Sequence, residues 1–360
     1  MAALQEHLLG RAARHPAALA VSAPDGELTH GQLDAASSRL ARALREAGCR
    51  AGDRVALLLP RGATSITATL AVLKAGGVCV PLDARAPAIR SALVLADARP
   101  AVILACAETA ATLKALRGFT STAGSAVIGW LGPAPDGRER PRILNPAAFA
   151  QAAFTQADVD AQSSAPLLLS GAREERTHLL YTVDATGRPA SLVLRHRTLA
   201  AFAAQARDRF GLRPGDRTSA DAGEADTAGV FHTLAALAAG ASVHVQPAEA
   251  DANPALLTGF IRSHNLTQWT TGTKRLAELA EGGLIHAGDF PALRRVFWHG
   301  TALASAVLRH LMERLPHVRF TGQHDPNVPS ADQAADMAAS LAAGAGRAKR
   351  PARPAVIGNA

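Results

Sequence analysis

Residues 55–105 read VALLLPRGATSITATLAVLKAGGVCVPLDARAPAIRSALVLADARPAVILA, and they decide the fold class. Three short apolar runs alternate here with two stretches of helical spacing. The apolar runs are residues 55–59, 78–80 and 101–105, and the helical stretches are residues 66–74 and 87–98. Continuous apolar runs of this length suit strands that are covered on both faces. The alternation predicts a parallel, doubly wound α/β sheet.

The same alternation returns later in the chain and predicts a second α/β unit. A strand-like run, LLYTV, follows His178. In this later part, helical spacing is found at residues 199–210, 230–239, 256–264, 274–281 and 304–315, and strand-like runs at 241–245, 266–270 and 295–298; a further helical stretch, 33–46, precedes the first unit's strands. We therefore expect two α/β subdomains.

Two stretches lack this pattern and set the expected boundaries. Residues 120–165 are rich in Gly, Pro, Ser and Arg, which indicates a surface excursion or weakly ordered connector. After Pro329 the chain turns to Ala, Gly, Arg and Pro, and we expect disorder there. The predicted organisation is a first α/β subdomain with its connector over 1–165, a second over 166–329, and a disordered basic tail over 330–360.

The formal net charge of +8 suggests a nucleic-acid partner, but its placement argues against one. Much of the excess lies in the tail, which has no acidic residue between 337 and 360. Its basic residues are Arg347, Lys349, Arg350 and Arg353. Elsewhere Arg is scattered among Asp and Glu without alternating aromatic residues that could stack on bases. We expect no nucleic-acid partner.

The cysteines and the hydropathy pattern favour a cytoplasmic protein. Cys49, Cys79 and Cys106 are far apart and lack CxxC spacing, which is typical of thiols in a reducing compartment. No apolar run approaches 18 residues, so we expect no membrane span. The first 16 residues are interrupted by charge and do not read as a signal peptide.

Several common site motifs are absent from the sequence. There is no HExxH, GxSxG, GxGxxG or GxxxxGK[ST], and the 13 histidines lack metal-ligand spacing, so no metal site is expected. What remains is residues 181–191, YTVDATGRPAS, between a strand and a segment that leads to a helix.

These residues carry a resemblance that extends along the chain. YTVDATGRPAS resembles the phosphate loop of adenylate-forming (AMP-binding) enzymes, usually written YTSGTTGxPKG. Residues 73–83, LKAGGVCVPLD, resemble LKAGxAYVPLD, which is typical of adenylation domains of nonribosomal peptide synthetases. Residues 28–33 (LTHGQL) and 293–303 (LRRVFWHGTAL) are similar to further motifs of that superfamily, and the resemblance spans about residues 5–328.

The resemblance implies two stacked doubly wound subdomains of the adenylate-forming N-terminal core, here lacking the C-terminal lid. Members of the family join an amino acid carboxylate to the α-phosphate of ATP, release pyrophosphate and pass the acyl group to a carrier thiol. Implied partners are condensation, carrier or MbtH-like proteins of a peptide synthetase system.

The phosphate loop departs from the family pattern at the positions that meet phosphate. Such a loop works because Gly permits close backbone approach, hydroxyl groups donate and Lys neutralises charge. Thr186, Gly187 and Pro189 match the motif, but Asp184 replaces Gly and Ala190 replaces Lys. Val183 and Ala185 replace the Ser and a Thr. We expect this loop not to bind triphosphate in the family's manner.

Two further motifs are also degraded. The family's YGPTE corresponds to residues 324–328, HDPNV, in which only Pro326 matches and Val328 cannot ligate Mg²⁺. The Asp of the family's FDxS motif, which meets the substrate ammonium, is matched by Asp226 after a one-residue shift and by Thr227 without it. No counterpart of the later motifs, the lid lysine included, follows Val328.

Two functional readings follow from the resemblance. The first is a truncated, degenerate adenylation domain without ATP chemistry and without catalytic residues, which serves as a scaffold or is a remnant. The second is an active ATP-dependent ligase for an amino or carboxylic acid that uses ATP and Mg²⁺ and takes a lid in trans. The sequence favours the first.

Overall fold

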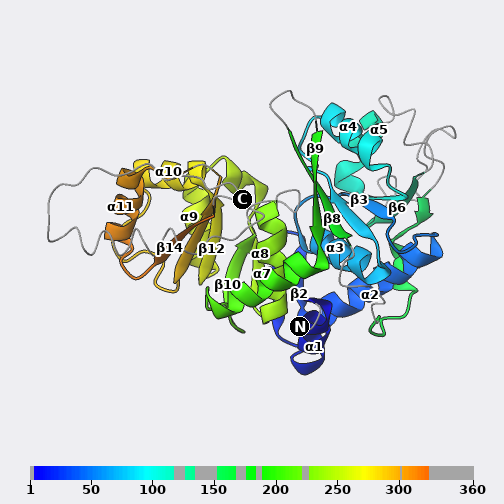
Figure 1. Cartoon of the computed structure of the whole chain (residues 1–360), viewed down its shortest axis with the longest axis horizontal. Coiled ribbons are helices and arrows are strands. Elements are labelled where there is room, and N and C mark those ends of the chain that lie inside the picture. Colours follow the sequence, from blue (N-terminus) through cyan, green and yellow to red (C-terminus); the bar gives the residue numbers. More distant parts are fainter. Residues whose placement is uncertain are drawn as a thin grey trace, which may run out of the picture.

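The computed structural model describes residues 4–116, 126–133, 152–167, 176–183, 189–220, 227–300 and 302–323. In this part of the chain two β-sheets, each covered by helices, lie side by side (Figure 1). None of the helices described is long and apolar enough to cross a bilayer.

The first sheet contains residues 55–105, whose alternation of apolar runs and helical spacing predicted an α/β fold. Its strand order is β7-β6-β5-β3-β4-β8-β9. These strands are β3 (Arg54–Leu58), β4 (Val78–Pro81), β5 (Val102–Cys106), β6 (Val127–Leu131), β7 (Ala152–Phe154), β8 (Arg176–Val183) and β9 (Pro189–Arg195). All neighbours are parallel except β8 and β9, which form an antiparallel pair.

The second sheet has the order β14-β13-β12-β10-β11-β1-β2. Its strands are β1 (Leu19–Ala23), β2 (Gly26–Thr29), β10 (Arg217–Ala220), β11 (Ser242–Val245), β12 (Gln268–Gly272), β13 (Arg295–His299) and β14 (Arg319–Gln323). Only β1 and β2 are antiparallel among these neighbours.

The two sheets exchange strands, so neither is built from one continuous half of the chain. β1 and β2 come from the first thirty residues but belong to the second sheet, while β8 and β9, after residue 166, belong to the first. The described strands of the expected domains over 1–165 and 166–329 are thus interleaved. The bounds of the two expected subdomains stay a prediction.

Helices cover both faces of each sheet, which confirms the doubly wound α/β class. On the first sheet, α2 (His30–Glu46) and α3 (Ala63–Ala75) pack with Val55 and Leu57, while α4 (Ala88–Ala98) and α5 (Ala110–Leu116) pack with Ala56 and Leu58 on the other face. The alternation of strand side chains between faces is why a continuous apolar run is needed here.

The second sheet is covered in the same way. α7 (His196–Asp208) and α8 (Thr227–Ala239) share a hydrophobic core with α2 and α3, and this core joins the two sheets. On the opposite face, α9 (Pro254–Ser263), α10 (Thr273–Glu281) and α11 (Ser305–Arg314) enclose a second core around Trp269 and Val296.

One sequence-based expectation was wrong. The region 120–165 is not only a surface excursion, because β6, β7 and the short helix α6 (Gln156–Asp160) lie in it and extend the first sheet. The phosphate-loop motif does lie between a strand and a segment that leads to a helix, because β9 pairs with β8 over seven residue pairs and runs into α7. Residues 330–360 lie outside the described residues.

Candidate functional site

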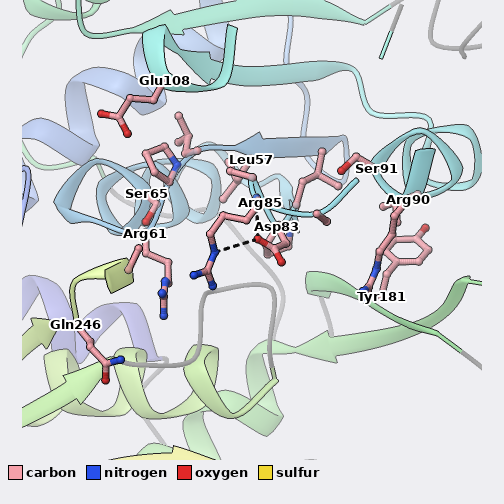
Figure 2. A pocket seen from close by; sticks show the side chains of 18 of the residues that line it. Leu57, Arg61, Ser65, Asp83, Arg85, Arg90, Ser91, Glu108, Tyr181 and Gln246 are labelled. Carbon is pink, nitrogen blue, oxygen red and sulfur yellow. Dashed lines mark hydrogen bonds and ion pairs between the residues drawn. The ribbon is translucent and has the colours of Figure 1, made fainter. Parts of the chain in front are cut away.

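The carboxyl ends of the central strands of the first sheet border a cavity of about 450 Å³ (Figure 2). Pro60 follows β3 and Pro81 ends β4, so both strands stop here and their loops turn away. β3 and β5 are neighbours, yet the chain leaves them in opposite directions, toward β4 and β6. In open α/β sheets, ligands bind at such a switch point, outside the carboxyl ends of the strands.

Both sheets contribute to the walls. The apolar lining includes Leu57, Leu59 and Leu82 from the first sheet, and Gln246 and Glu249 follow β11 of the second. In Figure 2, Arg61 and Gln246 lie at one end of the cavity, and Arg90 and Tyr181 lie at the other. The charged lining residues are Arg61, Arg85, Arg90, Asp83, Glu108 and Glu249. The cavity is therefore amphipathic, with an apolar floor and charges of both signs.

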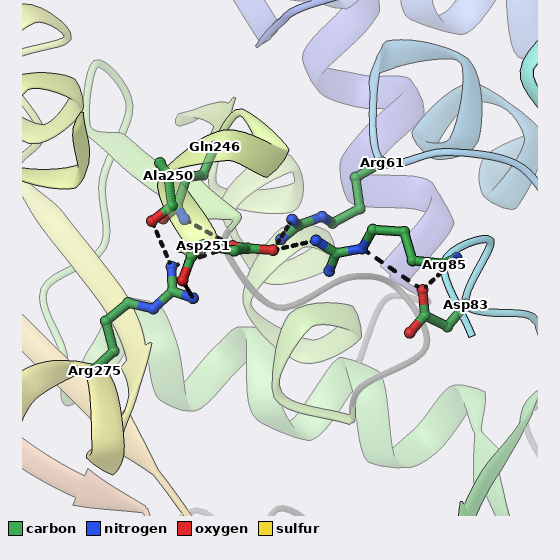
Figure 3. Close-up of polar contacts among 7 residues, drawn as sticks. All are labelled: Arg61, Asp83, Arg85, Gln246, Ala250, Asp251 and Arg275. Carbon is green, nitrogen blue, oxygen red and sulfur yellow. Dashed lines mark hydrogen bonds and ion pairs between the residues drawn. The ribbon is translucent and has the colours of Figure 1, made fainter. Parts of the chain in front are cut away.

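Beside the cavity, three guanidinium groups converge on the carboxylate of Asp251 (Figure 3). Arg61 and Arg85 reach Asp251 Oδ2 from the first sheet, Arg85 through Nη1 at 2.5 Å. Arg275, on α10, donates through Nη1 to Asp251 Oδ1 at 3.2 Å, and Gln246 Nε2 donates to the same oxygen at 3.0 Å. Asp251 ends the 3-10 helix η2 (Ala248–Asp251), so this network ties η2 to both lobes.

The charges around Asp251 decide its protonation state. Burial alone would raise the pKa of its carboxyl, but the hydrogen bond from Arg85 and the charge of Arg61 outweigh burial and hold the pKa below the ordinary value. Asp251 meets all three guanidinium groups, and Asp83 Oδ1 also lies 3.9 Å from Nε of Arg85. Asp251 is therefore a carboxylate, rather than a carboxylic acid, between these groups.

Tyr181, the first residue of the phosphate-loop motif, lines the cavity from β8. Its hydroxyl donates to Asp97 Oδ2 at 2.5 Å. Burial and this carboxylate raise the pKa of Tyr181, because both disfavour the phenolate. Tyr181 is thus a neutral hydrogen-bond donor.

The structure places both flanks of the predicted phosphate loop but not its centre. Val183 pairs with Pro189, and Thr182 pairs with Ala190, so the loop closes an antiparallel hairpin. Ala190 is exposed on β9, and Thr182 Oγ1 donates to its carbonyl oxygen at 3.4 Å. At the position where the motif has Lys, this chain thus exposes only the methyl group of Ala190.

The other predicted site residues fall outside the described part of the chain. These are Asp184, Ala185, Thr186 and Gly187 in the loop, Asp226 before α8, and the segment 324–328 after β14. The assignments of Thr186, Gly187, Pro189 and Asp226 to binding roles stay predictions.

Sequence reasoning missed the residues that surround the cavity. Arg61 and Asp251 are 190 positions apart, and no motif joins them. A weak signal was present, because Arg61 follows the proline after β3 and Arg85 follows the VPLD segment after β4. Charged residues just past the carboxyl ends of parallel strands are candidates for a site in this class of fold.

The fold and this placement of motifs agree with a known family. The profile described as AMP-binding enzyme matches residues 9–322, so the chain belongs to the AMP-binding enzyme family. Similar proteins include the L-proline–[L-prolyl-carrier protein] ligase of Streptomyces coelicolor, with 30% identity over 80% of this chain and 52% of the ligase. Another is syringomycin synthase SyrB1 of Pseudomonas syringae pv. syringae, with 28% identity over 86% of this chain and 45% of the synthase. The chain therefore spans about half the length of these two relatives.

Solved structures show the same fold. The nonribosomal peptide synthetase FmoA3 aligns with a TM-score of 0.74 and 24% identity, over 92% of this chain and 33% of that one. The N-terminal domain of FACL13 from Mycobacterium tuberculosis also reaches 0.74, with 18% identity, over 90% of this chain and 76% of that one. The expected architecture of an adenylate-forming N-terminal core is confirmed.

Proposed function

We propose that this chain is an adenylation-domain-like protein of a nonribosomal peptide synthetase system that does not activate its substrate with ATP and acts as a scaffold. The observation that carries the proposal is Ala190, whose exposed methyl group on β9 stands at the motif's Lys. The loop that β8 and β9 close therefore has no Lys at its distal end, and Asp184 stands at a motif Gly at its near end.

The size of the electrostatic effect supports this reading. A carboxylate about 4 Å from a phosphate oxygen, at an effective dielectric constant of about 20, costs roughly 4 kcal/mol before relaxation. The single hydroxyl of Thr186 does not offset such a cost, since one hydrogen bond contributes about 1 kcal/mol net. The loss of the motif's Lys at Ala190 and the gain of a carboxylate at Asp184 both weaken the binding of a phosphate group.

Arg61 and Arg85 do not supply the missing charge. Both are held by Asp251, so moving either to a phosphate breaks a partly buried ion pair. Arg90, the third arginine of the lining, lies at the Tyr181 end of the cavity (Figure 2).

An active ligase is the alternative, and the relatives favour it. The L-prolyl ligase carries its activity in its name, and an FmoA3 structure described as an α-methyl-L-serine-AMP bound form is 26% identical, with a TM-score of 0.72. That form covers 91% of this chain and 33% of FmoA3. In the alternative, the chain would use ATP and Mg²⁺, and Asp226 would meet the substrate ammonium.

Amino-acid-dependent pyrophosphate exchange separates the two. We expect no exchange above background with any standard amino acid, for the chain alone or mixed with neighbouring synthetase proteins. Exchange that depends on one amino acid would establish the ligase instead. The scaffold role is tested by pull-down against condensation, carrier and MbtH-like proteins, and absence of any complex would leave only a remnant without a partner.

A further inference from the structure

Arginines gather at the amino-terminal edge of the second sheet, opposite the strand ends that face the cavity. Arg217, Arg295 and Arg319 are the first residues of β10, β13 and β14. Arg294 directly precedes β13, and Arg213 lies in the turn before β10. We call these five residues the amino-edge cluster.

Backbone hydrogen bonds show that these strand starts lie next to one another. Thr267 N donates to Arg217 O at 2.8 Å, and Arg294 N donates to Thr267 O at 2.8 Å. Arg319 N in turn donates to Arg294 O at 2.9 Å. Since neighbouring strands lie about 4.8 Å apart, the cluster extends about 14 Å along the edge from β10 to β14. Figure 1 shows β10, β12 and β14 in this lobe.

The cluster has far more positive than negative charge. In the part of the chain that the structure describes, Asp216 is the only carboxylate that pairs with any of the five. It is 3% exposed, pairs closely with Arg294 and lies 4.0 Å from Nε of Arg213. One buried acid thus pairs with two arginines, and the other three have no acidic partner among the described residues.

Two of the remaining arginines, Arg217 and Arg295, contact neutral groups. Arg217 Nε donates to the carbonyl oxygen of Asn265 at 2.7 Å, and Arg295 Nη1 donates to Thr321 Oγ1 at 3.0 Å. Burial and the charges of Arg319 and Arg294 hold the pKa of Arg295 below its ordinary value, which reflects the mutual repulsion within the cluster. Arg213 and Arg319 are exposed, so they are open to an external anion.

The shape and surroundings select the kind of anion. An edge about 14 Å long suits an extended partner better than a small ion. Arg295 packs over Phe210 and Phe297, but both rings are buried and therefore unavailable for stacking on bases. Carboxylates match guanidinium groups with paired hydrogen bonds. We propose that the amino-edge cluster is a docking surface for an acidic, Asp- and Glu-rich segment of a partner protein.

Fluorescence anisotropy of a labelled decamer of alternating Glu and Asp tests this surface in the full chain. We expect saturable binding at low salt that weakens as ionic strength rises. The double variant Arg213→Glu/Arg319→Glu should weaken binding by about tenfold or more, because each reversal removes an attraction and adds a repulsion. Arg213→Lys/Arg319→Lys should retain most of the affinity.

The matched control is Arg50→Glu/Lys114→Glu, which makes the same change of charge at exposed positions outside the second sheet. It should leave affinity within about twofold, and circular dichroism should show both double variants to be folded. The proposal is overturned if the acidic decamer does not bind, if a Gln/Asn decamer binds equally well, or if the control weakens binding as much. Tighter binding of a single-stranded oligonucleotide of equal charge would assign the surface to nucleic acid instead. None of these outcomes depends on whether the phosphate loop binds ATP.

Discussion

Arg61 and Asp251 form an ion pair across 190 residues of sequence, and this pair fastens η2 of one lobe to the carboxyl end of β3 in the other. Their side chains are 16% and 20% exposed, so water screens the pair only in part. Arg85 and Arg275 share the same carboxylate. Asp251 is therefore the carboxylate that all three guanidinium groups share.

Asp251→Asn should destabilise the protein, because three guanidinium groups lose their common counter-charge. We expect a loss of about 2 kcal/mol in the free energy of unfolding, measured by urea titration. Asp83→Asn, at a carboxylate that is 49% exposed and contacts Arg85 alone among these cations, should change it by less than about 0.5 kcal/mol. Equal effects of the two variants would contradict the role given to Asp251.

Lys74→Met should be strongly destabilising, because Lys74 is buried with its partners. Its ammonium donates to Asp34 O at 2.8 Å, to Asp34 Oδ1 at 2.5 Å and to Ser38 Oγ at 2.9 Å. Removing it leaves a carboxylate in a mostly apolar surrounding, and we expect a loss of about 3 kcal/mol in urea unfolding. Lys274→Met, at a side chain that is 91% exposed, is the control and should be near neutral. If Asp34→Ala in the Lys74→Met background recovers no stability, the loss has another cause.

Acid should destabilise the protein through His178. Complete burial, together with the nearby His196, lowers the pKa of His178 to about 3, and neither ring nitrogen has a hydrogen-bond partner among the residues that the structure describes. The unfolded chain binds a proton at an ordinary pKa of about 6.5, so the contribution to stability is fully present above about pH 6.5 and is lost as the pH falls toward 3.

At pH 5 this loss amounts to about 2 kcal/mol relative to pH 7. The measurement is the free energy of unfolding across this range for the wild type and His178→Leu. The variant should have a shallower slope by about one proton. A slope that is unchanged in His178→Leu would show that other groups cause the acid sensitivity.

Two Gly→Ala substitutions should have opposite signs. A Cβ on Gly129, in β6, would collide with Cζ of Phe154 and lie 2.6 Å from Cδ2 of Leu104, so Gly129→Ala should cost about 2 kcal/mol or more. Gly259, within α9, has nothing within 4 Å of that position, and Ala there should stabilise by about 0.5–1 kcal/mol. Thermal midpoints of the two variants should therefore move in opposite directions, and a shared direction would refute the packing of β6 against β7.

Asp184→Gly/Ala190→Lys should increase affinity for ATP, because it removes a negative charge and adds a positive one at the hairpin. We expect at least about tenfold tighter binding by titration calorimetry with Mg-ATP, since two charge changes act in the same direction. Ala201→Lys adds a positive charge at an exposed position on α7 and should have little effect. Tight binding of ATP by the wild type would contradict the proposed loss of nucleotide binding.

Much of the fold could be predicted because its central strands are apolar and short. Residues 55–59, 78–80 and 101–105 are covered on both faces, and their composition reports that burial directly. β10 and β14 were missed because they contain Thr, Ser, Gly and Gln. Thr218 and Ser219 are buried all the same, since their hydroxyls donate to carbonyl oxygens of neighbouring strands. Composition does not reveal polar groups that are satisfied across strands.

The candidate site was less accessible to sequence reasoning. Motif similarity found the hairpin of β8 and β9, because the motif is contiguous. The residues around the cavity come from loops that meet only after the sheets have exchanged strands. No sequence motif marks Arg61 or Asp251. Their role in joining the two lobes follows only from the ion pair that they form in the folded protein.

The exchange of strands between the sheets has a consequence during synthesis on the ribosome. Val21 in β1 pairs with Val243 in β11, which leaves the exit tunnel about 220 residues later. Until then the nascent β1–β2 hairpin has no sheet to join, and its apolar face is exposed. Contacts this distant in sequence slow folding and favour aggregation of the incomplete chain. We therefore expect a nascent chain released before residue 243 to require a chaperone, and fragments ending at residue 165 to be recovered only when the remainder is produced with them.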